Sequence, residues 1–162
     1  MTEEEFNIHK KFLQEAIHLA QENVSTGRGG PFGAIIVKEG QVLARACNEV
    51  LGTHDPTMHA EVNAIRQACQ KLNHFELTDC VIYSSCEPCP MCLGAIYWAR
   101  PKAVYFAANR ATVGKHGFDD GFIYREIGLP LDQRHIPTVC ITLDNAEEPF
   151  TFWDQKEDKI RY

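Results

Sequence analysis

Two short motifs combine residue types that bind a transition metal with a type that moves protons. One is a His-x-Glu that begins at His59, and the other is the run Cys-Glu-Pro-Cys-Pro-Met-Cys, which ends at Cys92. A catalytic zinc site usually has three protein ligands and leaves its fourth position open. His59, Cys89 and Cys92 would supply those three ligands. Glu61 would then be a carboxylate beside the metal, placed to carry protons during the reaction.

The spacing of both motifs predicts that each lies at the start of a helix. His59 and Glu61 are two positions apart, and such side chains share a site most easily in a first turn, because they do not face each other further along a helix. The residues Asp55-Pro56-Thr57 would supply the start signal of that helix. Pro90 suits the first position of the second helix. Helix N-termini favour negative charge and would help to keep the cysteine thiolates ionised, so we infer that two N-termini converge on one metal.

Cys86 extends the cysteine motif to Cys-x2-Cys-x2-Cys, which partly matches a bacterial iron–sulfur pattern. Ile96 stands where the fourth cysteine of that pattern belongs, and the His-x-Glu would be left without a role. Zinc is therefore favoured, and Cys86 is interpreted as a buried thiol at the end of a strand. A zinc-stabilised binding module without catalysis is the alternative from another class. It would need a fourth protein ligand, for which His54 is the only spare residue nearby, and it has no use for Glu61.

Composition and charge limit the class of protein. The 162 residues, 44% of them hydrophobic, are enough for one domain with its own core. No apolar run reaches the ~18 residues that span a bilayer, and the acidic N-terminus does not resemble a signal peptide. Seven cysteines, an odd number, favour metal binding in a reducing compartment over disulfides. We therefore expect a cytoplasmic protein outside the membrane, and the net charge of −6 disfavours a nucleic-acid partner.

Hydrophobic periodicity and turn signals predict a hairpin followed by alternating helices and strands. Thr2 and Glu5 form a capping-box signal at the start of the first helix. The expected helices span about 3–24, 58–72, 89–99, 122–127 and 149–158, and the expected strands span 34–38, 41–47, 80–84, 103–107 and 138–143. This order predicts an α/β layered sandwich with a mixed sheet. The ligand crevice of such a sheet lies beyond the carboxyl ends of strands, near helix N-termini.

The two motifs together resemble the H-x-E…P-C-x-x-C signature of the cytidine deaminase-like superfamily of zinc deaminases. Within it, the chain is most similar to the bacterial guanine deaminases, from the first helix to the last residue. The segments that carry the resemblance are Gly29-Gly30-Pro31-Phe32-Gly33-Ala34, His59-Ala60-Glu61-Val62, Cys86 to Trp98, and Gly117-Phe118-Asp119-Asp120. The resemblance implies a three-layer α/β/α sandwich with a five-stranded mixed sheet. It also implies a single zinc-dependent domain over 1–162 that hydrolyses guanine to xanthine and ammonia.

The resemblance further implies which residues contact the purine base. They are Asn48, the backbone of Ala60, Asp120, Phe32, Trp98 and Tyr162. An amide both donates and accepts hydrogen bonds, an ionised carboxylate accepts them from the N–H-rich edge of guanine, and aromatic rings stack on a planar base. Each side chain also has an ordinary structural role open to it, in a turn, a helix cap or the core, and Asp119 could serve as readily as Asp120.

The C-terminal segment carries the last expectation. In bacterial guanine deaminases it crosses to a second subunit, so the resemblance implies a homodimer that exchanges about 145–162, with Tyr162 closing the neighbour's pocket. The alternative is a tail that packs on its own core. Alternative substrates are adenosine in tRNA, and small amino-heterocycles or nucleosides such as cytosine, guanosine and ammeline. The acidic charge and the lack of a basic C-terminal helix disfavour tRNA.

Overall fold

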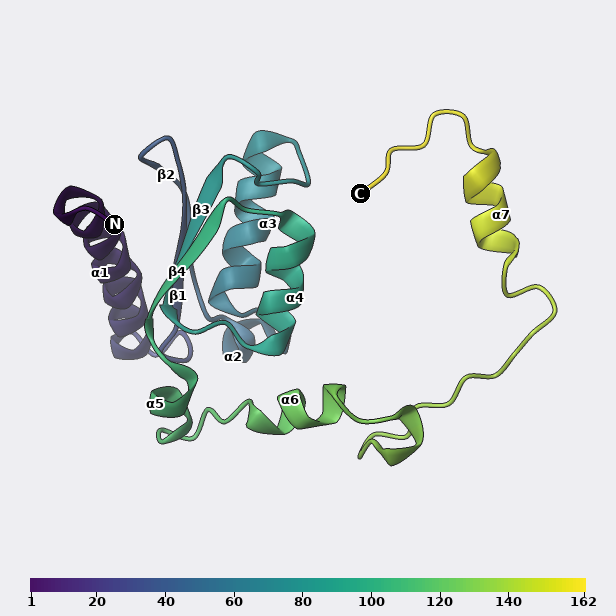
Figure 1. The fold of residues 1–162 in the computed structure, drawn as a ribbon. Helices are drawn as coiled ribbons and strands as arrows, with labels where there is room; N and C mark the ends of the chain where they lie inside the picture. The colour runs from purple at the N-terminus through teal and green to yellow at the C-terminus, as the bar shows by residue number, and fades with distance from the viewer. The chain divides into compact units, whose positions relative to one another are not determined.

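The computed structural model describes residues 1–162, which divide into two compact units, Met1–Asp120 and Gly121–Tyr162. The first unit is built around a mixed sheet with the strand order β2-β1-β3-β4 (Figure 1). Its strands are β1 (Gly33–Lys38), β2 (Gln41–Cys47), β3 (Cys80–Cys86) and β4 (Ala103–Ala108). β1 is antiparallel to both of its neighbours, whereas β3 and β4 are parallel. The mixed sheet is confirmed, but it has four strands where five were expected.

The hairpin of β1 and β2 turns at the two residues that the sequence indicated. Glu39 and Gly40 both have positive φ angles, of 50° and 76°. A two-residue turn in which both residues have positive φ has a backbone twist that matches the right-handed twist of the paired strands, and short hairpins therefore favour it. The strands pair from Lys38 opposite Gln41 to Gly33 opposite Cys47, with a shift of register between Ile36 and Val37. The hairpin thereby brings the first residue of β1 and the last residue of β2 side by side at the same end of the strands.

Helices cover both faces of this sheet (Figure 1). One face is covered by α1 (Glu3–Ser25), which begins with the predicted capping box of Thr2 and Glu5. The other face is covered by α3 (Ala60–Leu72) and α4 (Pro90–Ala99). Side chains alternate along a strand, so successive residues reach opposite layers. In β3, Ile82 packs in the apolar cluster on the α3 side, and Tyr83 packs with Phe12 of α1.

Short helices complete the first unit. They are α2 (Val50–Thr53) and α5 (Arg110–Gly114), neither of which the hydrophobic pattern predicted. A helix of four or five residues is too short to show a helical period in its apolar residues. Such helices can be recognised in a sequence only by their capping residues. At α5 that cap exists, because Oδ1 of Asn109 accepts a hydrogen bond of 2.9 Å from the backbone N–H of Thr112. None of the helices combines the length and apolar composition that crossing a bilayer requires.

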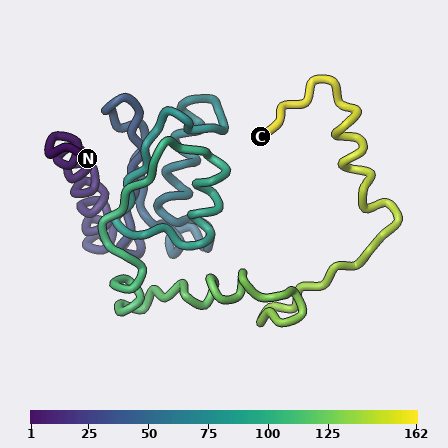
Figure 2. Tube along the Cα trace, viewed as in Figure 1, coloured from purple at the N-terminus to yellow at the C-terminus, as the bar shows by residue number.

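The second unit contains α6 (Gly121–Ile127), a short 3-10 helix (Leu131–Gln133) and α7 (Glu148–Gln155), and no residue of these elements is buried. The segment 138–143, which was expected to be the fifth strand, forms neither a helix nor a strand (Figure 2). A strand exists only when a neighbouring strand accepts its backbone hydrogen bonds, and the second unit holds none. The expected strand is therefore wrong for this chain. The expected final helix is present as α7, although it ends three residues earlier.

Candidate metal and catalytic site

His59 lies at the N-terminus of α3 and not inside the helix. It is the N-cap residue, with extended backbone, and its carbonyl accepts a 2.9 Å hydrogen bond from the backbone N–H of Asn63. The residues predicted to start this helix, Asp55-Pro56-Thr57, instead form a turn in the loop before it. Oδ1 of Asp55 accepts hydrogen bonds of 2.7 Å from both the backbone N–H and the hydroxyl of Thr57, which closes a turn in the preceding loop. The helix therefore begins at Ala60, two residues later than expected, because Asp55 is occupied by that turn.

The cysteine motif is organised in the same way. Cys89 is the N-cap of α4 and Pro90 is its first helical residue, as predicted. Proline is favoured there because its missing N–H and fixed φ cost nothing at a first position. Cys92 follows in the first turn and is completely buried. The two helix N-termini, which are far apart in sequence, converge on one point.

His59, Cys89 and Cys92 form the one cluster of potential metal ligands in the structure. Nδ1 of His59 lies 3.5 Å from the Sγ atom of each cysteine. A tetrahedral ion with Zn–N of about 2.05 Å and Zn–S of about 2.3 Å separates nitrogen from sulfur by about 3.5 Å, so the donor set fits zinc. Cys86 and His54 are not part of the cluster. This removes the fourth ligand that a purely structural zinc site would need.

Hydrogen bonds within the cluster favour the thiolate of Cys89, whereas the hydrogen bond with Cys89 raises the pKa of the Cys92 thiol. Hydrogen bonding with Cys92, and then with His59, lowers the pKa of the Cys89 thiol to about 4. The same contact with Cys89 raises the pKa of His59. Cys86 differs, because burial raises the pKa of its thiol to about 12, and its Sγ donates a hydrogen bond of 3.2 Å to the carbonyl of Glu87. Cys86 is thus a thiol at the end of β3, as the sequence indicated, but it is half-buried and not fully buried.

Glu61 lies beside this cluster without belonging to it. Its side chain is buried, and burial raises the pKa of its carboxyl group. Oε1 accepts a hydrogen bond of 2.8 Å from the hydroxyl of Ser84, and Oε2 lies 3.4 Å from Sγ of Cys92. A buried carboxyl group with a raised pKa binds a proton more readily than an exposed one, which suits a group that must both take up and release a proton. The geometry therefore permits the proton transfer that the sequence predicted for Glu61.

Asn48 and Phe32 lie together where β2 ends and β1 begins. The backbone N–H of Asn48, which is buried at the end of β2, donates a 3.1 Å hydrogen bond to the carbonyl of Phe32. The next residue, Glu49, donates from its backbone N–H to the carbonyl of Met58, which immediately precedes His59. The ring of Phe32 also meets Phe118 edge to face, with centroids 4.9 Å apart. These contacts tie Asn48 and Phe32 to the segment that holds the first metal ligand.

Asp120 brings a second carboxylate close to the cluster. Its Oδ1 atom is buried and has no hydrogen-bond partner in the structure. Burial raises the pKa of this carboxyl group, the charge of Arg110 lowers it, and the charge of Cys89 raises it. A buried acceptor without a partner is costly, so such an atom calls for a donor that the chain itself does not provide. A ligand N–H would be such a donor.

The three remaining residues that were predicted to contact the substrate are Ala60, Trp98 and Tyr162. Ala60 is fully buried as the first residue of α3, where backbone N–H groups of a helix lack internal partners. Trp98 lies on α4 and is 64% exposed. Tyr162 lies in the second unit and is exposed. Roles for these three residues in substrate binding stay predictions.

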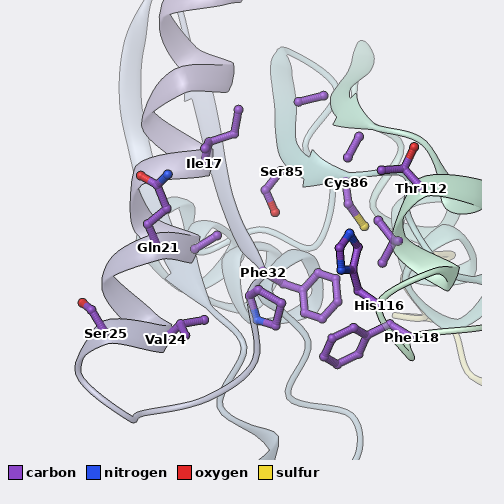
Figure 3. Close-up of a pocket in the computed structure, with 15 residues that line it drawn as sticks. Ile17, Gln21, Val24, Ser25, Phe32, Ser85, Cys86, Thr112, His116 and Phe118 are labelled. Carbon is purple, nitrogen blue, oxygen red and sulfur yellow. The ribbon is translucent and has the colours of Figure 1, made fainter.

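A separate cleft of about 830 Å³ opens on the α1 face of the sheet. Figure 3 shows Ile17 and Val24 of α1 on one side of it, His116 and Phe118 on the other, and Phe32 between them. The lining is mostly apolar and includes none of the metal ligands, nor Glu61. Phe32 therefore lies between this cleft and the end of β2 where Asn48 is held.

Two residues that support the site were missed by reading the sequence. Ser84 was assigned to an apolar strand, and Asn23 was not singled out on the first helix. Both are 1% exposed. A serine within an apolar strand and an asparagine on a helix's inner face are the available signals, because buried polar side chains need partners. Neither signal indicates which group the side chain hydrogen-bonds to.

Comparison with known proteins agrees with the interpretation of this cluster as a zinc site. A family model described as the cytidine and deoxycytidylate deaminase zinc-binding region matches residues 6–108. The chain is 53% identical to the guanine deaminase of Bacillus subtilis over 154 residues, which cover 95% of this chain and 99% of that protein. The X-ray structure of guanine deaminase from that organism superposes with a TM-score of 0.94 at 52% identity, over 95% of this chain and 98% of the other.

A tRNA-specific adenosine deaminase of Aquifex aeolicus is more distant. It is 43% identical over 97 residues, which cover 60% of this chain and 64% of that protein. The matched family region contains both motifs, and the ligand geometry fits the metal for which the family is described. The chain therefore belongs to the cytidine and deoxycytidylate deaminase family of zinc-binding proteins.

Proposed function

We propose that this protein is a zinc-dependent guanine deaminase, which hydrolyses guanine to xanthine and ammonia in purine catabolism or salvage. The observation that carries the proposal is the extent of the likeness to the Bacillus subtilis guanine deaminase. It covers 95% of the chain, whereas the likeness to the Aquifex aeolicus tRNA-specific adenosine deaminase covers 60%. The family region ends at residue 108, so the wider match also includes the segment that contains Asp120.

His59, Cys89 and Cys92 would hold the zinc, which supplies Lewis-acid activation of a water molecule when bound. Glu61 takes the two protons that this water loses. One goes to a ring nitrogen of the base and the other to the departing amino group, so that ammonia leaves as the new C–O bond becomes the carbonyl of xanthine. Burial favours this role, because a raised carboxyl pKa lets one group act first as a base and then as an acid.

Asp120 and Asn48 would read the edge of guanine. The unpartnered Oδ1 of Asp120 is an acceptor, and guanine presents N–H donors where adenine does not. Oδ1 of Asn48 lies 3.4 Å from the backbone N–H groups of both Gly30 and Val50. That orientation leaves the NH2 group of Asn48 to donate to an acceptor of the base. Phe32 and Trp98 would provide stacking surfaces, and the backbone of Ala60 a further contact.

We further propose that the active form is a homodimer in which residues from about 145 to 162 cross to the second copy. The support comes from the second unit by itself. The second unit buries none of the residues in its helices, and the large apolar side chains of Phe150, Phe152 and Ile160, which lie in the proposed exchanged segment, are exposed. An exchange would give these side chains a surface to pack against and would bring Tyr162 to the neighbour's pocket.

We also propose a cytoplasmic location for the enzyme, which its cysteines support. None of the seven is in a disulfide, as expected in a reducing compartment, and two of them would be metal ligands. Its substrate is a small purine base. A nucleic-acid partner and a membrane have no support in the acidic chain, whose net charge is −6.

The decisive experiment measures ammonia release from the zinc-loaded protein with guanine, adenine, cytosine, guanosine and ammeline, and deamination of adenosine at the wobble position of a tRNA anticodon stem-loop. Glu61→Gln is the control, because it should fold and keep zinc while turnover falls by about 10²–10⁴-fold. We expect guanine to have the highest kcat/KM. A higher kcat/KM for tRNA adenosine or for another base would refute the assignment, and near-normal turnover by Glu61→Gln would remove Glu61 from the mechanism.

A further inference from the structure

The carboxylate of Glu61 is held by a serine from the neighbouring layer of the fold. The hydroxyl of Ser84, in β3, donates a hydrogen bond of 2.8 Å to Oε1 of Glu61 in α3. The other carboxylate oxygen, Oε2, lies 3.4 Å from Sγ of the metal ligand Cys92. One oxygen is therefore fixed to the sheet while the other is directed to the metal cluster.

Ser84 occupies a position where packing alone would favour an apolar side chain. It is 1% exposed, and it faces the α3 layer, as does Ile82 two residues before it in the apolar cluster. A buried hydroxyl destabilises the fold unless it is hydrogen-bonded, so alanine would fill this place at a lower cost. The backbone N–H of Cys86 donates to Oγ of Ser84 over 3.4 Å, which leaves the hydroxyl proton for Glu61.

We propose that Ser84 is a positioning residue, which fixes Oε1 of Glu61 so that Oε2 is the oxygen presented to the reacting water and base. The inference rests on the proposed deamination and assigns a further residue to it. A cysteine that ligates zinc is a thiolate and has no proton to donate to Oε2. The side-chain contact that remains to orient the carboxylate is the one from Ser84.

The consequence is a loss in the chemical step and not in binding. A carboxylate free to rotate spends less time in the geometry that transfers a proton, and small misplacements of a reacting group are costly. The hydroxyl of Ser84 forms its hydrogen bonds with Glu61 and with the backbone of Cys86, and not with the candidate metal ligands or with the residues proposed to read the base. Its removal should therefore lower kcat, leave KM nearly unchanged and leave zinc content unchanged.

The test compares Ser84→Ala with Ser84→Thr, which retains the hydroxyl, and with Ser85→Ala. Ser85 is the neighbouring buried serine, but its Oγ accepts a 3.1 Å hydrogen bond from the backbone N–H of Gly33 and does not reach Glu61. For Ser84→Ala we expect kcat for guanine to fall about tenfold to hundredfold, with KM within about threefold of wild type. Ser84→Thr should stay within about fivefold of the wild-type kcat, and Ser85→Ala within about threefold.

A second readout does not depend on turnover. Zinc content is measured for each variant, and crystal structures of the zinc-loaded wild type and Ser84→Ala locate the Glu61 carboxylate, which should rotate only in the variant. If Ser84→Ala does not fold, Ser84→Cys replaces it, because a thiol fills the site but is a weak donor. An unmoved carboxylate, an undiminished kcat in the variant, or an equal loss in Ser85→Ala would overturn the proposal. A wild type that does not deaminate guanine refutes the proposed function instead, and the two crystal structures still decide the role of Ser84.

Discussion

The side-chain amide of Asn23, near the end of α1, donates a 2.8 Å hydrogen bond to the backbone carbonyl of Asn48, at the end of β2. The same nitrogen donates to the carbonyl of Gly30 over 2.9 Å. Asn23 is buried, and it connects the first helix both to the glycine loop and to a residue proposed to read the base. The position of Asn48 is thus set by α1 as well as by its own strand.

Replacing Asn23 with aspartate tests this connection. The variant keeps the shape of the side chain but turns an acceptor toward two carbonyl oxygens, which leaves both without their donor. We expect a loss of about 1–3 kcal/mol in the free energy of unfolding, measured by urea denaturation, and a raised KM for guanine. Asn7→Asp is the matched control, because Asn7 is exposed on the same helix. Equal stability of the two variants would contradict a structural role for Asn23.

Gly29 is required by the close approach of two backbone segments. A Cβ atom at this position would lie 2.1 Å from the carbonyl oxygen of Asn48, an atom that cannot move aside without shifting β2. Gly29→Ala should therefore destabilise the protein by about 1–3 kcal/mol in the same assay. Gly94→Ala should stabilise it by up to about 1 kcal/mol, since Gly94 lies within α4 with open space around it. A stable Gly29→Ala would show that the loop is not tightly held.

Zinc should depend on two cysteines and not on the third. Elemental analysis of the wild type should give roughly one zinc per chain, as a site of three protein ligands implies. A Cys89→Ala, Cys92→Ala double variant should contain almost none. Cys86→Ala should keep its zinc, because Cys86 lies outside the cluster and the raised pKa of its thiol keeps it protonated. Loss of zinc in the Cys86 variant, or full zinc in the double variant, would reverse this assignment.

Asp120 should promote guanine turnover while its ionised carboxylate lowers the free energy of unfolding. Burial raises the pKa of its carboxyl group above 3.8 in the folded state, so its ionisation destabilises the fold as pH rises from 3.8 through that higher pKa. Asp120→Asn should therefore be at least as stable as wild type at pH 7 and keep its zinc, with the stability difference shrinking as pH falls through that range. Its kcat/KM for guanine should fall about fivefold to hundredfold, because one buried partner of the base is lost.

Asp119→Asn provides the comparison, since the neighbouring carboxylate could in principle make the same contact. Thermal unfolding followed across pH 4–8, together with guanine kinetics at pH 7, measures both effects of each variant. A large kinetic loss in Asp119→Asn and none in Asp120→Asn would transfer the substrate contact to Asp119.

The exchange of C-terminal segments can be tested by complementation. Deleting Asp158 to Tyr162 should leave zinc content intact and sharply lower guanine turnover, because the neighbour's pocket then stays open to water. Mixing this truncated chain with full-length Glu61→Gln should restore activity, since the intact tail of one chain completes the catalytic site of the other. Glu61→Gln carrying the same truncation is the control and should give no rescue. Mixed dimers, verified by mass, that remain inactive would rule out the exchange.

Sequence alone determined the features that depend on local spacing. The three candidate zinc ligands, the hairpin at Glu39 and Gly40, and the proline that opens α4 are all indicated by patterns within a few residues. Caps and turns are local because the atoms that satisfy them lie within about one turn of the chain. That is why two motifs from different parts of the chain were enough to indicate the family.

Tertiary structure alone decided which distant groups meet where no metal motif links them. Ser84 and Glu61 are 23 positions apart, and Asn23 and Asn48 are 25 apart, so no local pattern could pair them. The same holds for segment 138–143, whose alternating apolar residues suit a strand but whose state depends on a partner strand that the second unit does not contain. Periodicity shows which side chains need burial or a hydrogen bond, but the partner is fixed only when helices and strands pack.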